Sequence, residues 1–262
     1  MSMNSSFNFN RFARLYKHQL VLNSRLILFG TLGYCGSIFI IMFLMYLDVQ
    51  GRSFNIKSFI PMIYIFIIGF GVLYNGYSFK SLRSKEGCMS YLLLPATLTE
   101  KFLLEFFNRV VLSFIFLPFL FWLTFNTIGV FFDVIDEISY EFISIIDIYD
   151  YAIAENNDFP IFRIVTPLIL LIYIVPFTGT TMFFKQPLIK TLFAVTVLAF
   201  GYATLTYFLA EVIGINQYRI PDNGIFIPVN KGSSVLFFEI ILWLSNIVFI
   251  TVAYLKLKEK EV

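Results

Sequence analysis

Residues 80–105 read KSLRSKEGCMSYLLLPATLTEKFLLE and lie between two long apolar runs. Thr97 and Glu100 have the spacing of a capping box, in which each residue's side chain accepts a hydrogen bond from the other's backbone amide. Pro95 disfavours a helical conformation at Leu94. We therefore predict that one helix ends near Leu94 and that another begins at Thr97 and continues into the next apolar run. The stretch is either a basic loop that sets orientation or a helix that docks a partner.

The composition is that of a membrane protein. The chain is 58% hydrophobic and 19% aromatic, with a mean hydropathy of +0.80, well above a soluble domain. The net charge of +2 provides no bulk basic field for nucleic acid, so we expect no nucleic-acid partner. Cys35 and Cys88 have no metal-ligand spacing, and His18 is the only histidine. We therefore expect no disulfide, no metal site and no catalytic residues.

Six apolar segments each have about the 20 residues that a bilayer core requires. They predict an all-α, polytopic fold: a single transmembrane domain over residues 1–262 with six membrane-spanning helices. The spans are residues 26–47, 59–79, 110–130, 164–184, 192–213 and 235–255. The fourth contains Pro167 and Pro176, each of which would kink it.

Residues 1–25 place cations and apolar side chains on opposite sides of a helical wheel. The cations are Arg11, Arg14, His18 and Arg25, and the apolar side chains are Phe9, Phe12, Tyr16 and Leu20. This pattern predicts an amphipathic helix in the membrane interface, with cations toward lipid headgroups. The alternative is a merely basic flank that sets orientation whether or not it is helical.

Two local patterns make further predictions about packing. Gly30, Gly33 and Gly36 form a small-residue face that would let another helix approach closely. Charged residues recur at four-residue spacing at the cytoplasmic start of the third span, and they are Lys101, Glu105 and Arg109. There we expect Arg109 to extend its charge toward the interface.

The distribution of charge predicts the orientation. The segments on one side of the predicted membrane hold only five of the 19 Lys and Arg residues, namely Arg52, Lys57, Arg163, Arg219 and Lys231. The positive-inside rule then puts both termini and residues 80–105 in the cytoplasm. Residues 131–160, which carry eight acids and no Lys or Arg from Asp133 onward, become an external acidic loop.

Two acids fall within apolar runs of the outer half, Glu211 and Glu239. An intramembrane carboxylate normally faces protein or water, so the pair could line a substrate path or gate. The alternative is that both lie at interface depth, near the helix ends.

This layout resembles the permease subunit of an ABC-2 type transporter, with a type V exporter-like architecture. The resemblance covers the whole chain, and its most specific element is YLLLPATLTEKFLLEF, residues 91–106. It implies that residues 81–89 form a coupling helix that docks on an ATP-binding subunit, that residues 185–190 form a second contact, and that residues 214–233 form an outer re-entrant region. The implied docking residues are Ser81, Leu82, Arg83, Lys85, Glu86, Lys185 and Gln186.

The resemblance also implies partners and a location. The chain has no G-x-x-x-x-G-K-[ST] loop, so ATP and Mg²⁺ would be bound by a separate ATPase subunit and not by this chain. A second permease copy, identical or related, would complete the exporter in a bacterial cytoplasmic membrane, surrounded by lipid. The alternatives are a non-transporting assembly or scaffold protein and an intramembrane lipid-modifying enzyme.

Overall fold

The computed structural model describes the greater part of the chain. The described residues are 7–48, 56–83, 87, 89, 91, 96–136, 144, 161–183, 185–212 and 231–261. Three predicted features lie wholly or mostly outside them: the helix end near Leu94, the acidic loop at residues 131–160 and the polar loop at residues 214–233.

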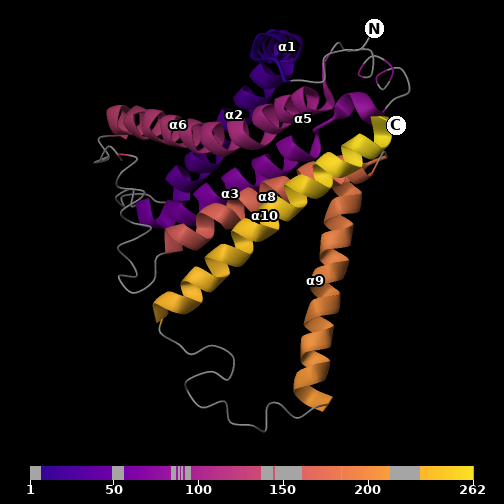
Figure 1. Ribbon diagram of the computed structural model, residues 1–262. Helices are drawn as coiled ribbons and strands as arrows, with labels where there is room; N and C mark the ends of the chain where they lie inside the picture. Colours follow the sequence, from indigo (N-terminus) through magenta and orange to yellow (C-terminus); the bar gives the residue numbers. More distant parts are fainter. Residues whose placement is uncertain are drawn as a thin grey trace.

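The described segments are helical and include no strand, which confirms the all-α prediction for this part of the chain (Figure 1). The helices are α1 (Phe9–Leu22), α2 (Ser24–Asp48), α3 (Ile56–Gly76), the 3-10 helix η1 (Lys80–Arg83), α5 (Leu98–Phe106), the π-helical turn η2 (Phe107–Val111), α6 (Leu112–Asp136), α8 (Ile161–Met182), α9 (Pro187–Val212) and α10 (Lys231–Glu261). The helix predicted to begin at Thr97 therefore extends through three consecutive elements, α5, η2 and α6.

Within the described residues, five helical segments are long and apolar enough to cross a membrane. They are Ser24–Met45, Leu98–Val134, Arg163–Met182, Pro187–Leu205 and Leu236–Lys260. The remaining predicted span, residues 59–79, falls on α3, where the apolar helix found among the described residues is shorter, Met62–Gly76. The structure thus supports five of the six predicted spans by length and composition.

The core lies in two clusters that share α3. Tyr34 and Ile38 of α2 pack with Phe66 of α3 and Phe121 of α6 in the first cluster. In the second cluster, side chains of α3 and α5 pack with those of α8 and α10, including the fully buried Phe177. Figure 1 shows α3, α8 and α10 running side by side, so these helices form the body of the bundle.

Helix α9 leaves this body. It contacts the bundle near its first residues, where Leu188 lies against Gly76 and Thr191 against Gly179. Figure 1 shows the rest of α9 extending away from α8 and α10. Leu198 and Phe200 remain largely exposed, as expected for a helix whose apolar surface contacts lipid.

Close helix approach occurs at glycines other than the predicted ones. A Cβ at Gly30, Gly33 or Gly36 would meet no described atom within 4 Å. By contrast, a Cβ at Gly71 would overlap the ring of Tyr173. Glycine spacing along one helix shows where another helix could approach closely. Which glycine contacts a neighbouring helix depends on the packing of the whole bundle.

The two prolines of α8 do not interrupt the helix, which is continuous from Ile161 to Met182. Asn246 of α10 is buried and donates a hydrogen bond from Nδ2 to the Pro167 carbonyl oxygen, at 3.0 Å. Asn246 thus adds a polar contact between α10 and the backbone of α8 at its first proline.

Candidate functional site

The predicted capping box is present at the start of α5. The Glu100 amide donates to the Thr97 hydroxyl at 3.3 Å, and the Thr97 amide donates to Glu100 Oε2 at 3.0 Å. The helix begins at Leu98, as the spacing predicted. These two bonds satisfy backbone donors that the first turn of a helix leaves without partners.

The same Glu100 carboxylate also binds α1. Arg11 donates from Nε to Oε2 at 2.7 Å and from Nη2 to Oε1 at 2.6 Å, and the Asn8 amide donates to Oε1 at 2.8 Å. Each carboxylate oxygen therefore accepts two hydrogen bonds, and the Glu100 side chain is 0% exposed. The hydrogen bond to Glu100 raises the pKa of Arg11 above its usual value. This geometry favours a permanently charged pair.

The structure corrects the predicted position of one α1 cation, Arg11. The segment is helical from Phe9 to Leu22, but Arg11 faces α5 and not open headgroup space. The ring of Phe12 lies 6.4 Å, centroid to centroid, from that of Phe107 in η2. Gln19 donates to Glu105 Oε1 at 2.7 Å. Helix α1 thus binds protein through both polar and aromatic side chains, and its place relative to the membrane stays a prediction.

Arg109 does not extend its charge to the interface as predicted. The π-helical turn η2 directs it inward, where it is 6% exposed and its guanidinium lies 4.5 Å from the centroid of the Tyr74 ring. Its Nη1 donates to the Tyr74 carbonyl at 3.4 Å, and its Nε lies 3.7 Å from Glu105 Oε2. The extra residue of a π-turn rotates the side chains that follow, and such turns frequently mark functional sites.

The predicted coupling residues are partly described. Ser81 and Leu82 belong to η1, and Lys85 and Glu86 lie outside the described residues. Arg83 folds back on α3, donating from Nη2 to the carbonyl oxygens of Gly76 at 2.7 Å and Ser78 at 3.4 Å. Burial lowers its pKa below the usual arginine value. A cation at the carboxyl end of a helix satisfies free carbonyls and opposes the helix dipole.

The second predicted contact forms the turn between α8 and α9. Lys185 and Gln186 are both exposed, and Gln186 has a φ of 50°, the left-handed conformation that favours glycine. Because Leu188 packs against Gly76, this turn lies near the carboxyl end of α3 and therefore near η1. The structure thus brings the two predicted docking segments to the same end of the bundle.

The chain's carboxyl terminus reaches this end as well. The Tyr254 ring of α10 lies 5.4 Å, centroid to centroid, from that of Phe102 in α5. Figure 1 shows the C-terminus beside the first turns of α5, with the start of α9 nearby. We call the end formed by η1, the first turns of α5 and α9 and the last turn of α10 the cationic end, because it carries Lys80, Arg83, Lys185, Lys258 and Lys260.

The two acids proposed for a gate have different outcomes. Glu211 lies in the last turn of α9, and its side chain is outside what the structure describes. Glu239 of α10 forms an ion pair with Arg163 of α8, with 2.9 Å between Oε2 and Nη2, and its side chain is 21% exposed. Arg163 stands at the start of α8, far from the cationic end (Figure 1). This pairing agrees with interface depth, and a role in a substrate path stays a prediction.

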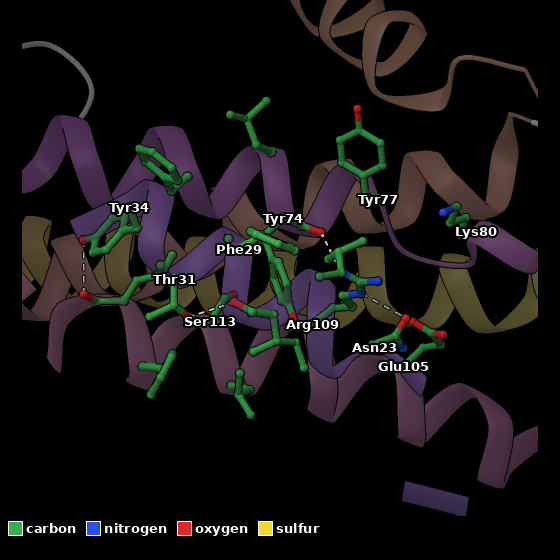
Figure 2. A pocket seen from close by; sticks show the side chains of 18 of the residues that line it. Asn23, Phe29, Thr31, Tyr34, Tyr74, Tyr77, Lys80, Glu105, Arg109 and Ser113 are labelled. Atoms are coloured by element: carbon green, nitrogen blue, oxygen red, sulfur yellow. Dashed lines mark hydrogen bonds and ion pairs between the residues drawn. The ribbon is translucent and has the colours of Figure 1, made fainter. Parts of the chain in front are cut away.

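A cavity of about 1220 Å³ opens beside the buried arginine. It is lined by α2, α3, η1 and the α5–α6 helix, and Gln19 of α1 also lines it. Figure 2 shows Tyr74 and Arg109 within it, Lys80 and Glu105 toward one end and Tyr34 toward the other. Its polar end therefore belongs to the cationic end of the bundle, and its remainder is largely apolar.

Sequence reasoning missed the pairing of Arg11 with Glu100 and the inward position of Arg109. A signal for the first existed, since Glu100 was identified as a cap and a buried capping carboxylate attracts a cation. No signal identified Arg11 as that cation among the basic residues of α1. Among the described residues, no cluster of His, Cys, Asp or Glu could hold a metal ion.

Comparisons with protein-family models, with curated proteins and with solved structures found no match. The class of the protein therefore follows from the chain itself. Several long apolar helices indicate a multi-pass membrane protein of all-helical fold.

Proposed function

We propose that this chain is the permease subunit of an ATP-binding cassette exporter. In this proposal it has six spans, with both termini and the cationic end in the cytoplasm of a bacterial cell. The observation that carries the proposal is the convergence of η1 and the Lys185–Gln186 turn at one end of the bundle, because an ATPase that pushes on a permease needs both contacts within reach.

The proposed mechanism is alternating access. Two permease copies enclose a path, and closure of two ATP-bound subunits moves the segments that dock on them. Arg83 supports this because it ties η1 to the carboxyl end of α3 through two carbonyl oxygens. A push on η1 would therefore move α3, which packs against α6 and α8. Glu100 would carry the same motion to α1.

The proposal is tested by co-expressing the chain with the genes that neighbour its own, purifying it with any ATP-binding protein they encode, and measuring ATP hydrolysis in lipid vesicles. Lys185→Glu is the informative variant, because Lys185 is exposed and its reversal leaves the bundle's internal contacts intact. We expect the permease to stimulate hydrolysis and Lys185→Glu to reduce that stimulation several-fold, since rim charges act mainly on association.

Lys258→Glu is the matched control, because Lys258 is also exposed and lies at the same end but outside the predicted docking segments. Equal loss in both variants would show a general charge effect. Purification without an ATPase, with no stimulated hydrolysis, would contradict the proposal and favour a scaffold that uses the same surface to hold another protein.

A further inference from the structure

The cavity beside Arg109 combines a polar end with an apolar arm. The polar end holds three cations, Lys80, Arg83 and Arg109, against one acid, Glu105. The arm is lined by apolar side chains of α2, α3 and α6, namely Phe29, Phe70, Leu73, Phe116, Leu117 and Leu120. The excess of positive charge at one end only is the arrangement that an anionic amphiphile requires.

Two donors at the polar end find no hydrogen-bond acceptor in the part of the chain that the structure describes. They are the buried Nε atoms of Arg83 and Arg109. Glu105 Oε2 forms an ion pair with Arg109 Nε, but at 3.7 Å the two atoms are too far apart for a hydrogen bond. Buried guanidinium donors without acceptors are costly, so these atoms favour a ligand that brings oxygens.

The apolar arm opens on the side of the bundle. Phe29 of α2 is 71% exposed, and Leu73 of α3 and Tyr77, which directly follows α3, are about half exposed, yet all three line the cavity. Gly30 widens this opening, because a Cβ there would meet no described atom within 4 Å. In a membrane, these side chains would contact acyl chains, so an amphiphile can enter sideways from the bilayer.

We propose that this cavity binds one glycerophospholipid, with its phosphate between Arg83 and Arg109 and an acyl chain along Gly30. The lipid comes from the leaflet that faces the cationic end. The proposal does not depend on an ATPase partner and applies equally to a permease and to a scaffold.

The size of the cavity selects the lipid over free phosphate. A volume of about 1220 Å³ exceeds the roughly 300–1,000 Å³ of pockets for drug-sized ligands. Inorganic phosphate would fill only the polar end and leave the apolar arm uncovered. The phosphate group is common to both ligands, so the test includes each.

The test is native mass spectrometry of the purified full chain in detergent, titrated with dioleoyl phosphatidylglycerol. Gly30→Leu places a side chain in the arm at a position with open space around its Cβ. Gly33→Leu is the matched control, because Gly33 lies one turn further along α2, has equally open space and does not line the cavity. We expect wild type and Gly33→Leu to bind one lipid, and Gly30→Leu to bind it at least tenfold more weakly.

The polar end is tested by Lys80→Gln. Lys80 is exposed and lines the cavity, so its loss leaves the fold intact. Removing one lysine should weaken phosphatidylglycerol binding by roughly fivefold. This variant keeps the proposal testable even if a leucine at position 30 disturbs α2.

Three results would overturn the proposal. Equal lipid retention by wild type and Gly30→Leu would place the lipid elsewhere on the protein. Competition by inorganic phosphate at concentrations equal to the lipid would assign a free-anion site. Dioleoylglycerol has the acyl chains but no phosphate. If it bound as tightly as phosphatidylglycerol, recognition of the phosphate by the arginines would be excluded.

Discussion

Tyr173 lies against Gly71 so closely that its ring occupies the place of a side chain at position 71, and its hydroxyl donates to the Ile67 carbonyl at 2.8 Å. The contact joins α8 to α3 in the centre of the bundle, where Tyr173 is fully buried. The Tyr173 ring therefore fills the space that the missing side chain of Gly71 leaves open, and the hydrogen bond to Ile67 fixes the orientation of the ring.

Gly71→Ala should destabilise the protein by about 1–3 kcal/mol, because the added methyl group overlaps a rigid ring that has no room to move. Gly69→Ala is the control, since a Cβ at Gly69 meets nothing within 4 Å on the same helix. Thermal unfolding in detergent should show a lower midpoint for the first variant only. Equal midpoints would mean that α3 and α8 are further apart than described here.

Arg11→Met should release α1 from α5. The substitution removes two hydrogen bonds to the Glu100 carboxylate, and bonds to charged groups contribute about 1.5–3 kcal/mol. Hydrogen exchange of the α1 amides should accelerate accordingly. Arg14→Met is the control, because Arg14 is exposed on the same helix. If both variants loosen α1 alike, general attraction to lipid headgroups would hold the helix, not Glu100.

Arg83→Met should lower the free energy of unfolding of the chain by itself, without any partner present. The Gly76 and Ser78 carbonyl oxygens lose a charged donor at the end of α3, which costs about 1.5–3 kcal/mol. Lys80→Met, on the same 3-10 helix but exposed, should leave the unfolding midpoint unchanged. A stable Arg83→Met protein that fails only in ATPase stimulation would assign Arg83 to docking and not to the helix end.

Asn246→Ala should weaken the pairing of α8 with α10. Its amide donates across the interface to the Pro167 carbonyl, and hydrogen bonds between membrane helices contribute roughly 0.6–1.7 kcal/mol. The neighbouring Ser245→Ala removes a hydroxyl that bonds only within α10, to the Ile241 carbonyl at 2.8 Å. Unfolding in detergent should distinguish the two variants, and equal stability would show that the Asn246 bond is not formed in solution.

Sequence reasoning succeeded where a feature depends on nearby residues. The capping box at Thr97 and Glu100 needs only residues three apart, and it was predicted correctly. Five of the predicted spans follow from apolar length alone and match helices long enough to cross a membrane. The helical character of residues 9–22 follows from the same local periodicity.

It failed where partners come from distant parts of the chain. Gly30 and Gly71 are both helical glycines, and only the placement of Tyr173 distinguishes them. The inward position of Arg109 follows from the π-helical turn and from Tyr74, and neither is visible in the spacing of charges. A helical wheel shows on which side of a helix Arg11 lies but not which element packs against that side. The wheel therefore predicts contact with lipid headgroups, and α5 occupies that place.

The bond between Arg11 and Glu100 also sets an order of events during synthesis. The two residues are 89 positions apart, so Arg11 leaves the ribosome long before its partner exists. At about 5–20 residues per second, the delay is roughly 4–18 s. During that time the first two hydrophobic segments emerge while α1 still lacks its partner on α5. Docking of α1 thus becomes a checkpoint in biogenesis, completed only after the chain has reached its third hydrophobic segment.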